Sequence, residues 1–446
     1  MSQIDIKDVN RLAFPAKLAA VSEPIINICD SAAISQYGSD PTTMLAAVGV
    51  ASSFFLSFIW VFSQTRTAMS TVMSKYFGAE KLNDVRTLVP QMILMNFLLG
   101  LFIYLVTNLF IGPIFEFFDA KGEVLSMAID YFSIRSIGFP FVLSYLMIFG
   151  VFRGVQNTMW AMIITLIAGG VNLGLDYIFI NGIENFIEPM GIKGVALASL
   201  ISQLLMFAMA VFYLYRKTKF NLNFLKPIHT EVNSLLGMSG NLIIRSAAVN
   251  TAYFFSTRFA SGYGESYIAV QHICMNIWFF SAFFIEGYCN AGNALAGKLN
   301  GQNNRLGLWN LSKVISKNSI KLALGLMTVL FLGYYFIGKL FFKDEMVVSL
   351  FYEVFWMVLL TLPLMAIAFT YDELLKGVGK MAYLRNTLFM ATFLGFVPVI
   401  YLSDLFDLKL HSIWIAFICW MSFRAIRLSS YFNANYYYQK APKSKK

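Results

Sequence analysis

The sequence predicts an all-α integral membrane protein whose twelve transmembrane helices form two six-helix bundles. Hydrophobic residues make up 58% of the 446 residues, the mean hydropathy is +0.65, and only 13% of residues are charged. Soluble domains carry about 25% charged residues, so this composition excludes one. Apolar stretches of roughly 20 residues or more, long enough to cross a bilayer, recur along the whole chain. Short segments also repeat half a chain apart, which predicts two similar halves.

The apolar stretches define the expected transmembrane helices in chain order. The segment before the first stretch is too charged for a cleavable signal peptide, so we expect the first helix to be retained. The twelve stretches cover residues of about 12–37, 44–74, 88–118, 125–150, 157–183, 192–216, 233–262, 265–297, 313–342, 347–376, 382–403 and 409–437.

The distribution of positive charge predicts the orientation of these helices. If both termini face the cytoplasm, most of the 34 lysines and arginines fall on cytoplasmic segments, among them Lys75, Arg216, Lys298 and Lys446. This asymmetry follows the positive-inside rule. The net charge of +10 is therefore assigned to membrane topology, and no nucleic-acid partner is expected.

An internal repeat with an offset of 223 residues, half the chain length, predicts how the helices are grouped. Residues 75–78 (KYFG) correspond to 298–301 (KLNG), and 153–155 (RGV) to 376–378 (KGV). Six helices per half give both halves the same orientation, so we expect a pseudo-two-fold axis along the membrane normal, a central cleft and alternating access. A basic linker over 216–232 separates an N-terminal lobe, 1–220, from a C-terminal lobe, 221–446.

One carboxylate within the fifth apolar stretch is the first candidate for function. Asp176 lies deep in this stretch, and Asn172 precedes it by one helical turn on the same helix face. An ionisable side chain at membrane depth is costly and typically marks an ion or substrate path. Gly170 and Gly174 lie on another face, where we expect a neighbouring helix to approach closely.

The first apolar stretch carries a second membrane carboxylate, Asp30. Glu23 and Asn27 share a helix face with Asp30. Pro15 and Pro24 each remove a helix hydrogen bond and permit a kink in this helix.

The two carboxylates suggest a shared coupling site. If Asp30 and Asp176 face each other, burial and like charge both favour a proton shared between them, as a proton-coupled carrier requires. The same carboxylates, with the Asn172 carbonyl oxygen and the Ser199 hydroxyl, would suit Na⁺ equally well. The residue types leave both coupling ions open, and no resident metal is expected.

The second half lacks counterparts of these acids. The offset of 223 places Tyr253, Gly395 and Val399 opposite Asp30, Asn172 and Asp176, which argues for a dedicated coupling site in the N-terminal lobe.

Other acids of the second half are weaker site candidates. They are Glu286 and Asp372, which we interpret, together with Arg245, mainly as internal salt bridges of that lobe.

The sequence contains no motif of an enzyme or an ATP-driven pump. It has no GxSxG, Walker A or HExxH segment, and its four cysteines form no CxxC pair. We therefore expect no catalytic residues and no cofactor, and any pumping must use an ion gradient.

Several segments resemble the multidrug and toxic compound extrusion (MATE) family. The most specific is FRGVQNTMWAMIITLIAGGVNLGLDYIFING (152–182), supported by 191–203, 22–35 and 74–85. The resemblance implies a two-lobe exporter driven by H⁺ or Na⁺, with Asp30 as the acid of the first helix, Asn172 and Asp176 as the pair of the fifth, and Ser199 where a threonine is common. The segment IRSAAVNTAY around Arg245 lacks the acid that some members carry there, and so resembles the damage-inducible (DinF) branch.

The predicted function is secondary-active antiport in a bacterial inner membrane. The substrate is expected to be an amphipathic, cationic small molecule, exported by a monomer embedded in membrane lipids, while protons enter through the N-terminal lobe. The nearest alternative is a flippase or exporter of a lipid-linked or other endogenous substrate on the same scaffold. A membrane enzyme would need clustered catalytic groups that the sequence lacks, and a passive channel would not need the duplicated halves.

Overall fold

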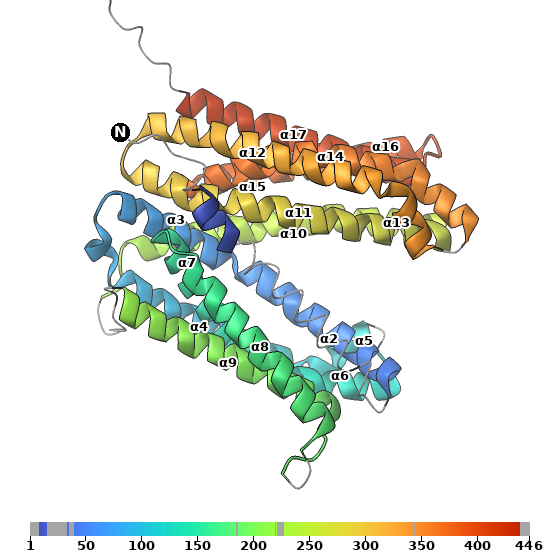
Figure 1. Cartoon of the computed structure of the whole chain (residues 1–446), viewed down its shortest axis with the longest axis horizontal. Coiled ribbons are helices and arrows are strands. Elements are labelled where there is room, and N and C mark those ends of the chain that lie inside the picture. Colours follow the sequence, from blue (N-terminus) through green and yellow to red (C-terminus); the bar gives the residue numbers. More distant parts are fainter. Residues whose placement is uncertain are drawn as a thin grey trace, which may run out of the picture. The chain divides into compact units, whose positions relative to one another are not determined.

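The structure is a computed structural model that describes residues 9–15, 34, 40–118, 120–183, 186–218, 220, 227–342 and 344–437. These residues are almost entirely helical (Figure 1). They divide into two units. The N-terminal unit contains Pro15–Met73 and Lys81–Leu236, and the C-terminal unit contains Met1–Phe14, Ser74–Glu80 and Gly237–Lys446.

After the helical segment 9–15, the described part of the N-terminal half from residue 40 onward contains α-helices joined by two short 3₁₀ turns. In chain order these are α2 (Pro41–Phe62), α3 (Gln64–Gly78), η1 (Leu82–Val85), α4 (Leu88–Leu109), α5 (Ile111–Phe117), α6 (Gly122–Arg135), η2 (Ser136–Gly138), α7 (Phe139–Gly154), α8 (Met159–Asn181) and α9 (Gly191–Lys217). Within the N-terminal unit α8 packs along α9, α4 along α7 and α2 along α6.

The C-terminal half repeats this pattern, with longer helices at α11 and α14 and a π-helical interruption between α15 and α16. In chain order its elements are α10 (Glu231–Tyr263), α11 (Glu265–Gly301), α12 (Arg305–Leu332), α13 (Tyr334–Phe341), α14 (Glu345–Gly377), α15 (Met381–Met390), the π-helical turn η3 (Ala391–Phe396), α16 (Val397–Asp404) and α17 (Leu410–Tyr436). The helix α14 packs against α11, α12 and α17 and forms the core of the C-terminal unit.

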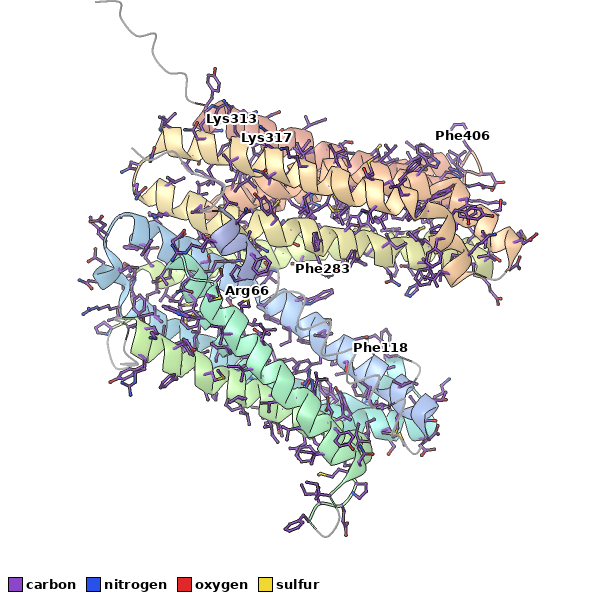
Figure 2. The ribbon with its side chains drawn as sticks, viewed as in Figure 1. Arg66, Phe118, Phe283, Lys313, Lys317 and Phe406 are labelled. Carbon is purple, nitrogen blue, oxygen red and sulfur yellow. The ribbon has the colours of Figure 1, made fainter. Side chains whose placement is uncertain are left out.

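The length and apolar composition of the helices are those of a multi-pass membrane protein. Ten described segments are long and apolar enough to cross a membrane. The helix α10 spans 33 residues and supplies a further crossing by length, since 33 residues extend about 50 Å. Most of the first expected span, 12–37, lies outside the described residues. Phe118 and Phe406, in the turns that follow α5 and α16, are also exposed (Figure 2).

The 223-residue offset also relates the ends of the helices. It connects the ends of α3 and α11, the starts of α5 and α13, and the starts of α6 and α14. It likewise connects the ends of α7 and α14 and the ends of α8 and α16. The repeat first seen in two short sequence motifs therefore extends through both halves.

The repeated KYFG and KLNG segments are packed against each other within the C-terminal unit. A methyl group on Gly78 would overlap the carbonyl oxygen of Lys298, and one on Gly301 would overlap the carbonyl oxygen of Lys75. The two contacts are reciprocal, because each glycine meets the lysine that begins the other motif. Backbones approach this closely only where a residue has no Cβ.

The two halves differ in where their helices are interrupted, and two of these interruptions lie in the N-terminal half. The first long span of the N-terminal half is divided at Ser63 into α2 and α3, whereas α11 runs unbroken through the corresponding Glu286. The turn η2 separates α6 from α7 just before Pro140, but α14 continues through the corresponding Pro363. The break at Ser63 is local, since Thr42–Gly78 still forms one candidate membrane span over the expected segment 44–74.

The linker packs with the N-terminal unit. The Gln91 side-chain amide donates to the carbonyl oxygen of Pro227 at 2.8 Å, and its carbonyl oxygen accepts from the backbone N–H of His229 at 2.9 Å. Gln91 is on α4, so these bonds attach the end of the linker to that helix. The N-terminal unit accordingly extends to Leu236.

Candidate functional site

The helix α8 places Asn172 and Asp176 in the interior of the N-terminal unit. Asp176 is fully buried, and Asn172 is 1% exposed. They lie one turn apart, so the helix carries both side chains on the same face. Asp176 is five residues from the end of α8 at Asn181, about 8 Å along the axis. The acid therefore lies closer to one end of its helix than the sequence led us to expect.

The neighbouring helix α9 adds Ser199 at a matching depth. The connection from α8 to α9 is short, and the two helices pack in opposite directions. Asn172 lies nine residues before the end of α8, and Ser199 lies eight residues after the start of α9. The two side chains are thus at the same level of the helix pair, and Ser199 is 2% exposed.

These neutral groups are buried without hydrogen-bond partners. Among the described residues, no group bonds to the Asn172 amide nitrogen, its carbonyl oxygen or the Ser199 hydroxyl. A buried unpaired polar group costs about 1–3 kcal/mol. Such a cost is typical of a site that receives water, an ion or a substrate group during function.

Sequence reasoning missed Gln203, one turn beyond Ser199 on α9. Gln203 is 5% exposed, and its side-chain oxygen has no hydrogen-bond partner among the described residues. This oxygen packs against Gly138 of η2, at the place that a Cβ of a larger residue would occupy. The signal was present in the sequence, because Ser199 and Gln203 are polar residues at i, i+4 within the apolar middle of this helix.

The other candidates of the N-terminal lobe fall mainly outside the described residues. These are Glu23, Pro24, Asn27 and Asp30. Pro15 is described, is buried, and is the last residue of the helical segment 9–15.

The expected close helix approach at Gly170 and Gly174 is wrong for the described part of the chain. A Cβ built on either glycine would have no atom within 4 Å, and both residues are exposed. The physical reason is that a small-residue face of a membrane helix can equally well lie against lipid.

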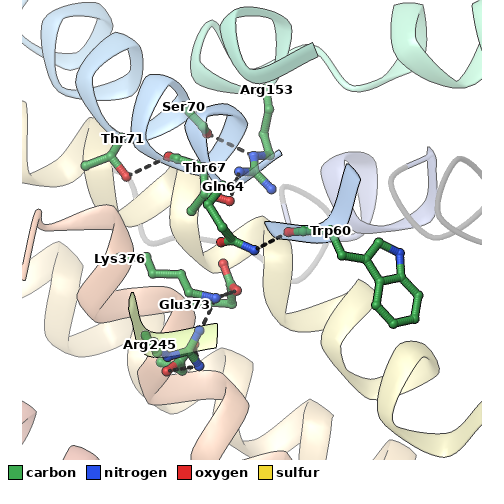
Figure 3. A network of polar contacts seen from close by, with 10 residues as sticks. Trp60, Gln64, Thr67, Ser70, Thr71, Arg153, Arg245, Glu373 and Lys376 are labelled. Atoms are coloured by element: carbon green, nitrogen blue, oxygen red, sulfur yellow. Dashed lines mark hydrogen bonds and ion pairs between the residues drawn. The ribbon is translucent and has the colours of Figure 1, made fainter. Parts of the chain in front are cut away.

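The C-terminal unit contains a buried network of ion pairs. Nη2 of Arg245 on α10 donates to both carboxylate oxygens of Asp372 on α14, at 2.9 and 3.0 Å. Lys376 Nζ lies 2.8 Å from Asp372 and 2.6 Å from Glu373 (Figure 3). Asp372, Glu373 and Lys376 are each no more than 5% exposed. The internal salt bridge expected between Arg245 and Asp372 is therefore present.

Two further charges face this network without joining its ion pairs. Glu286 on α11 experiences the charges of Lys376, Glu373 and Asp372, but it forms no ion pair among the described residues. Arg424 on α17 is 3% exposed, and its guanidinium lies over the rings of Trp420 and Phe369, at 5.0 and 5.5 Å.

The N-terminal unit has a cation at the position that corresponds to Lys376. Arg153, the last residue but one of α7, is 9% exposed and donates from Nε to the Ser70 hydroxyl at 2.9 Å (Figure 3). Its Nη2 lies 3.5 Å from the Thr67 hydroxyl. The repeat therefore keeps a buried cation, which here contacts two hydroxyl groups of α3, whereas Lys376 contacts two carboxylates of its own helix.

Comparisons with known proteins agree with this architecture. The sequence profile of the MatE family matches residues 15–178 and 242–402, in both halves of the chain. Protein DETOXIFICATION 42 of Arabidopsis thaliana is 25% identical, over 94% of this chain and 90% of its own length. DNA damage-inducible protein F of Escherichia coli (strain K12) is 23% identical, over 94% and 90% of the two chains.

Solved structures show the same fold. An outward-facing multidrug resistance MATE family transporter of the MOP superfamily matches with a TM-score of 0.84 at 20% identity, over 95% of this chain and 96% of the other. The family match extends over most of the chain, and the proteins of this family are transporters rather than enzymes. This chain of repeated transmembrane helices therefore belongs to the MatE family of multi-pass membrane transporters.

Proposed function

We propose that this transporter is a proton-coupled antiporter that exports amphipathic, cationic small molecules, including drugs, from a bacterial cell. The observation that carries the proposal is the group of buried polar side chains on α8 and α9. Asp176 lies within it, and Asn172 and Ser199 have no hydrogen-bond partners among the described residues. A buried carboxylate with unpaired neutral groups offers a binding place for a proton and for a cationic substrate in alternation.

The C-terminal ion network supports placing the coupling site in the N-terminal lobe. Asp372 is held by both Arg245 and Lys376, so its charge is already balanced by cations of the protein. Protonation of such an acid would leave buried cations without a partner, at a cost of about 3–5 kcal/mol. We therefore propose Asp176, buried beside the neutral side chains of Asn172 and Ser199, as the acid that changes its charge state during transport.

The donor groups favour a proton over a metal cation. A hard metal cation typically takes about six oxygen ligands, whereas a proton requires one carboxylate. On α8 and α9 the group offers the Asp176 carboxylate, the Asn172 oxygen, the Ser199 hydroxyl and the Gln203 oxygen, which is fewer than six. We propose that Asp30 completes the coupling site from the first helix, although it lies outside the described residues.

The transport cycle follows from these charges. Protonation of Asp30 and Asp176 removes negative charge from the N-terminal site, which releases a cationic substrate and favours a different packing of the first helix. Alternating access then returns the site to the cytoplasm, where the protons leave. In this proposal the protein acts as a monomer, in the inner membrane, with both termini cytoplasmic and no cofactor.

Reconstituted transport tests the coupling ion. Purified protein in liposomes should export a fluorescent organic cation when a pH gradient is imposed in the absence of Na⁺. A Na⁺ gradient without a pH difference should give the rate of protein-free liposomes. Efflux driven by Na⁺ alone would contradict proton coupling, and efflux with neither gradient would contradict antiport.

A further inference from the structure

A surface crevice between α10 and α15 combines an apolar wall with a cation. Its volume is about 420 Å³, and it is lined by Ile244 of α10 and by Arg385, Asn386, Phe389 and Met390 of α15. Ile244 is 47% exposed. Both helices belong to the C-terminal unit, and their outer faces are those that a membrane protein turns to lipid.

Arg385 lies one helical turn from the start of α15 and is not neutralised by a carboxylate. Its Nε and Nη2 donate to the Asn386 side-chain oxygen at 3.0 and 2.9 Å. Among the described residues it forms no ion pair, and no acceptor bonds to its Nη1. The exposed Lys380, directly before the helix, adds a second positive charge at this end. The crevice therefore attracts an anion at its polar end.

An apolar stripe continues from Arg385 toward the middle of the helix. Phe389 and Phe393 follow at successive turns, with ring centroids 5.5 Å apart. Phe393 is 45% exposed and Leu394 67% exposed. A cation at the helix end followed by exposed rings matches a molecule with an anionic head and a long apolar chain.

We propose that this crevice binds an anionic phospholipid of the leaflet on the side of the α14–α15 turn. The phosphate would accept hydrogen bonds from the free side of the Arg385 guanidinium, and one acyl chain would lie along Ile244, Phe389 and Phe393. Basic pockets between transmembrane helices recognise anionic head groups in this way. The site is separate from the transport residues, so it does not rest on the proposed function.

Lipid titrations of the purified full-length protein test this site. The apparent affinity for phosphatidylglycerol is measured by native mass spectrometry, with phosphatidylcholine of the same acyl chains as the neutral comparison. Arg385→Gln should weaken binding of phosphatidylglycerol about fivefold, the effect of one cation near a membrane surface, and leave phosphatidylcholine unchanged. Ile244→Trp, which fills the crevice and keeps its charge, should weaken binding of phosphatidylglycerol to a similar extent.

Lys317→Gln is the matched control, because Lys317 is an exposed cation on α12 of the same unit and does not line the crevice (Figure 2). It should leave the affinity for phosphatidylglycerol within about twofold of the unmodified protein. If Lys317→Gln and Arg385→Gln lower the affinity equally, binding reflects diffuse surface charge and the site is wrong. Displacement of the lipid by millimolar inorganic phosphate would also overturn the proposal, because the occupant would then be a free anion.

Discussion

Arg245 and Asp372 join α10 to α14 through one guanidinium nitrogen that donates to both carboxylate oxygens, at 2.9 and 3.0 Å. The Asp372 side chain is 5% exposed and that of Arg245 13% exposed, so water contributes little to balancing either charge. Lys376 shares the same carboxylate. Two cations of the chain itself therefore balance the buried charge of Asp372 in the C-terminal unit.

Removing one partner of this pair should destabilise the protein strongly. Asp372→Ala removes the buried carboxylate that both Arg245 and Lys376 contact. We therefore expect the free energy of unfolding to fall by about 3–5 kcal/mol. The double variant Arg245→Met with Asp372→Leu should recover part of this loss, because it removes both charges. Thermal unfolding of the detergent-solubilised protein measures both effects.

The exposed pair of Lys193 and Asp130 provides the control for that experiment. Its side chains are 54% and 43% exposed and lie 3.2 Å apart. Asp130→Ala should cost less than about 1 kcal/mol. A loss for Asp372→Ala as small as this would mean that the buried network does not hold the C-terminal unit together.

The reciprocal contacts of Gly78 and Gly301 should tolerate no side chain. Gly78→Ala and Gly301→Ala each force a methyl group against a backbone carbonyl, so we expect each to lower the free energy of unfolding by about 1–3 kcal/mol. Gly325→Ala on α12 is the control, since a Cβ there meets no atom within 4 Å. It should raise helix stability by up to about 1 kcal/mol. Chemical denaturation compares the three, and equal effects would refute the close contact.

The buried hydroxyl of Ser199 should lower the stability of the protein and support transport. Ser199→Ala removes a buried hydroxyl without a described partner, so we expect unfolding to require about 1 kcal/mol more while efflux falls. Ser202 is equally buried, but its hydroxyl donates to the Ala198 carbonyl oxygen at 2.9 Å. Ser202→Ala should therefore give no stabilisation and normal efflux. Unfolding curves and proteoliposome efflux of both variants check this contrast; the same response in both would contradict a special role of Ser199.

The sequence predicted the all-helical membrane fold well, because bilayer thickness imposes a length and a polarity on every crossing helix. The pairing of Arg245 with Asp372 was also predictable, since a buried charge in a membrane requires a partner. The contact between Gly78 and Lys298 was not, because a repeat identifies equivalent residues without showing that they touch.

Three further differences between the sequence-based expectations and the structure have separate physical causes. The break at Ser63 could not be predicted, because no proline or glycine lies next to it in the sequence. Gln203 was overlooked because an amide in an apolar helix is a weaker signal than a carboxylate. No helix of the described residues approaches Gly170 or Gly174, and the sequence could not show this because lipid and a neighbouring helix are alike in polarity.

The substitution Asp176→Asn tests the central claim most directly, because it keeps the shape of the side chain and removes its ability to exchange a proton. Efflux of a fluorescent organic cation from proteoliposomes is measured with an imposed pH gradient, alongside the thermal stability of the same preparation. We predict that the variant folds with unchanged thermal stability and gives the rate of protein-free liposomes. Normal gradient-driven efflux by folded Asp176→Asn protein would contradict the account.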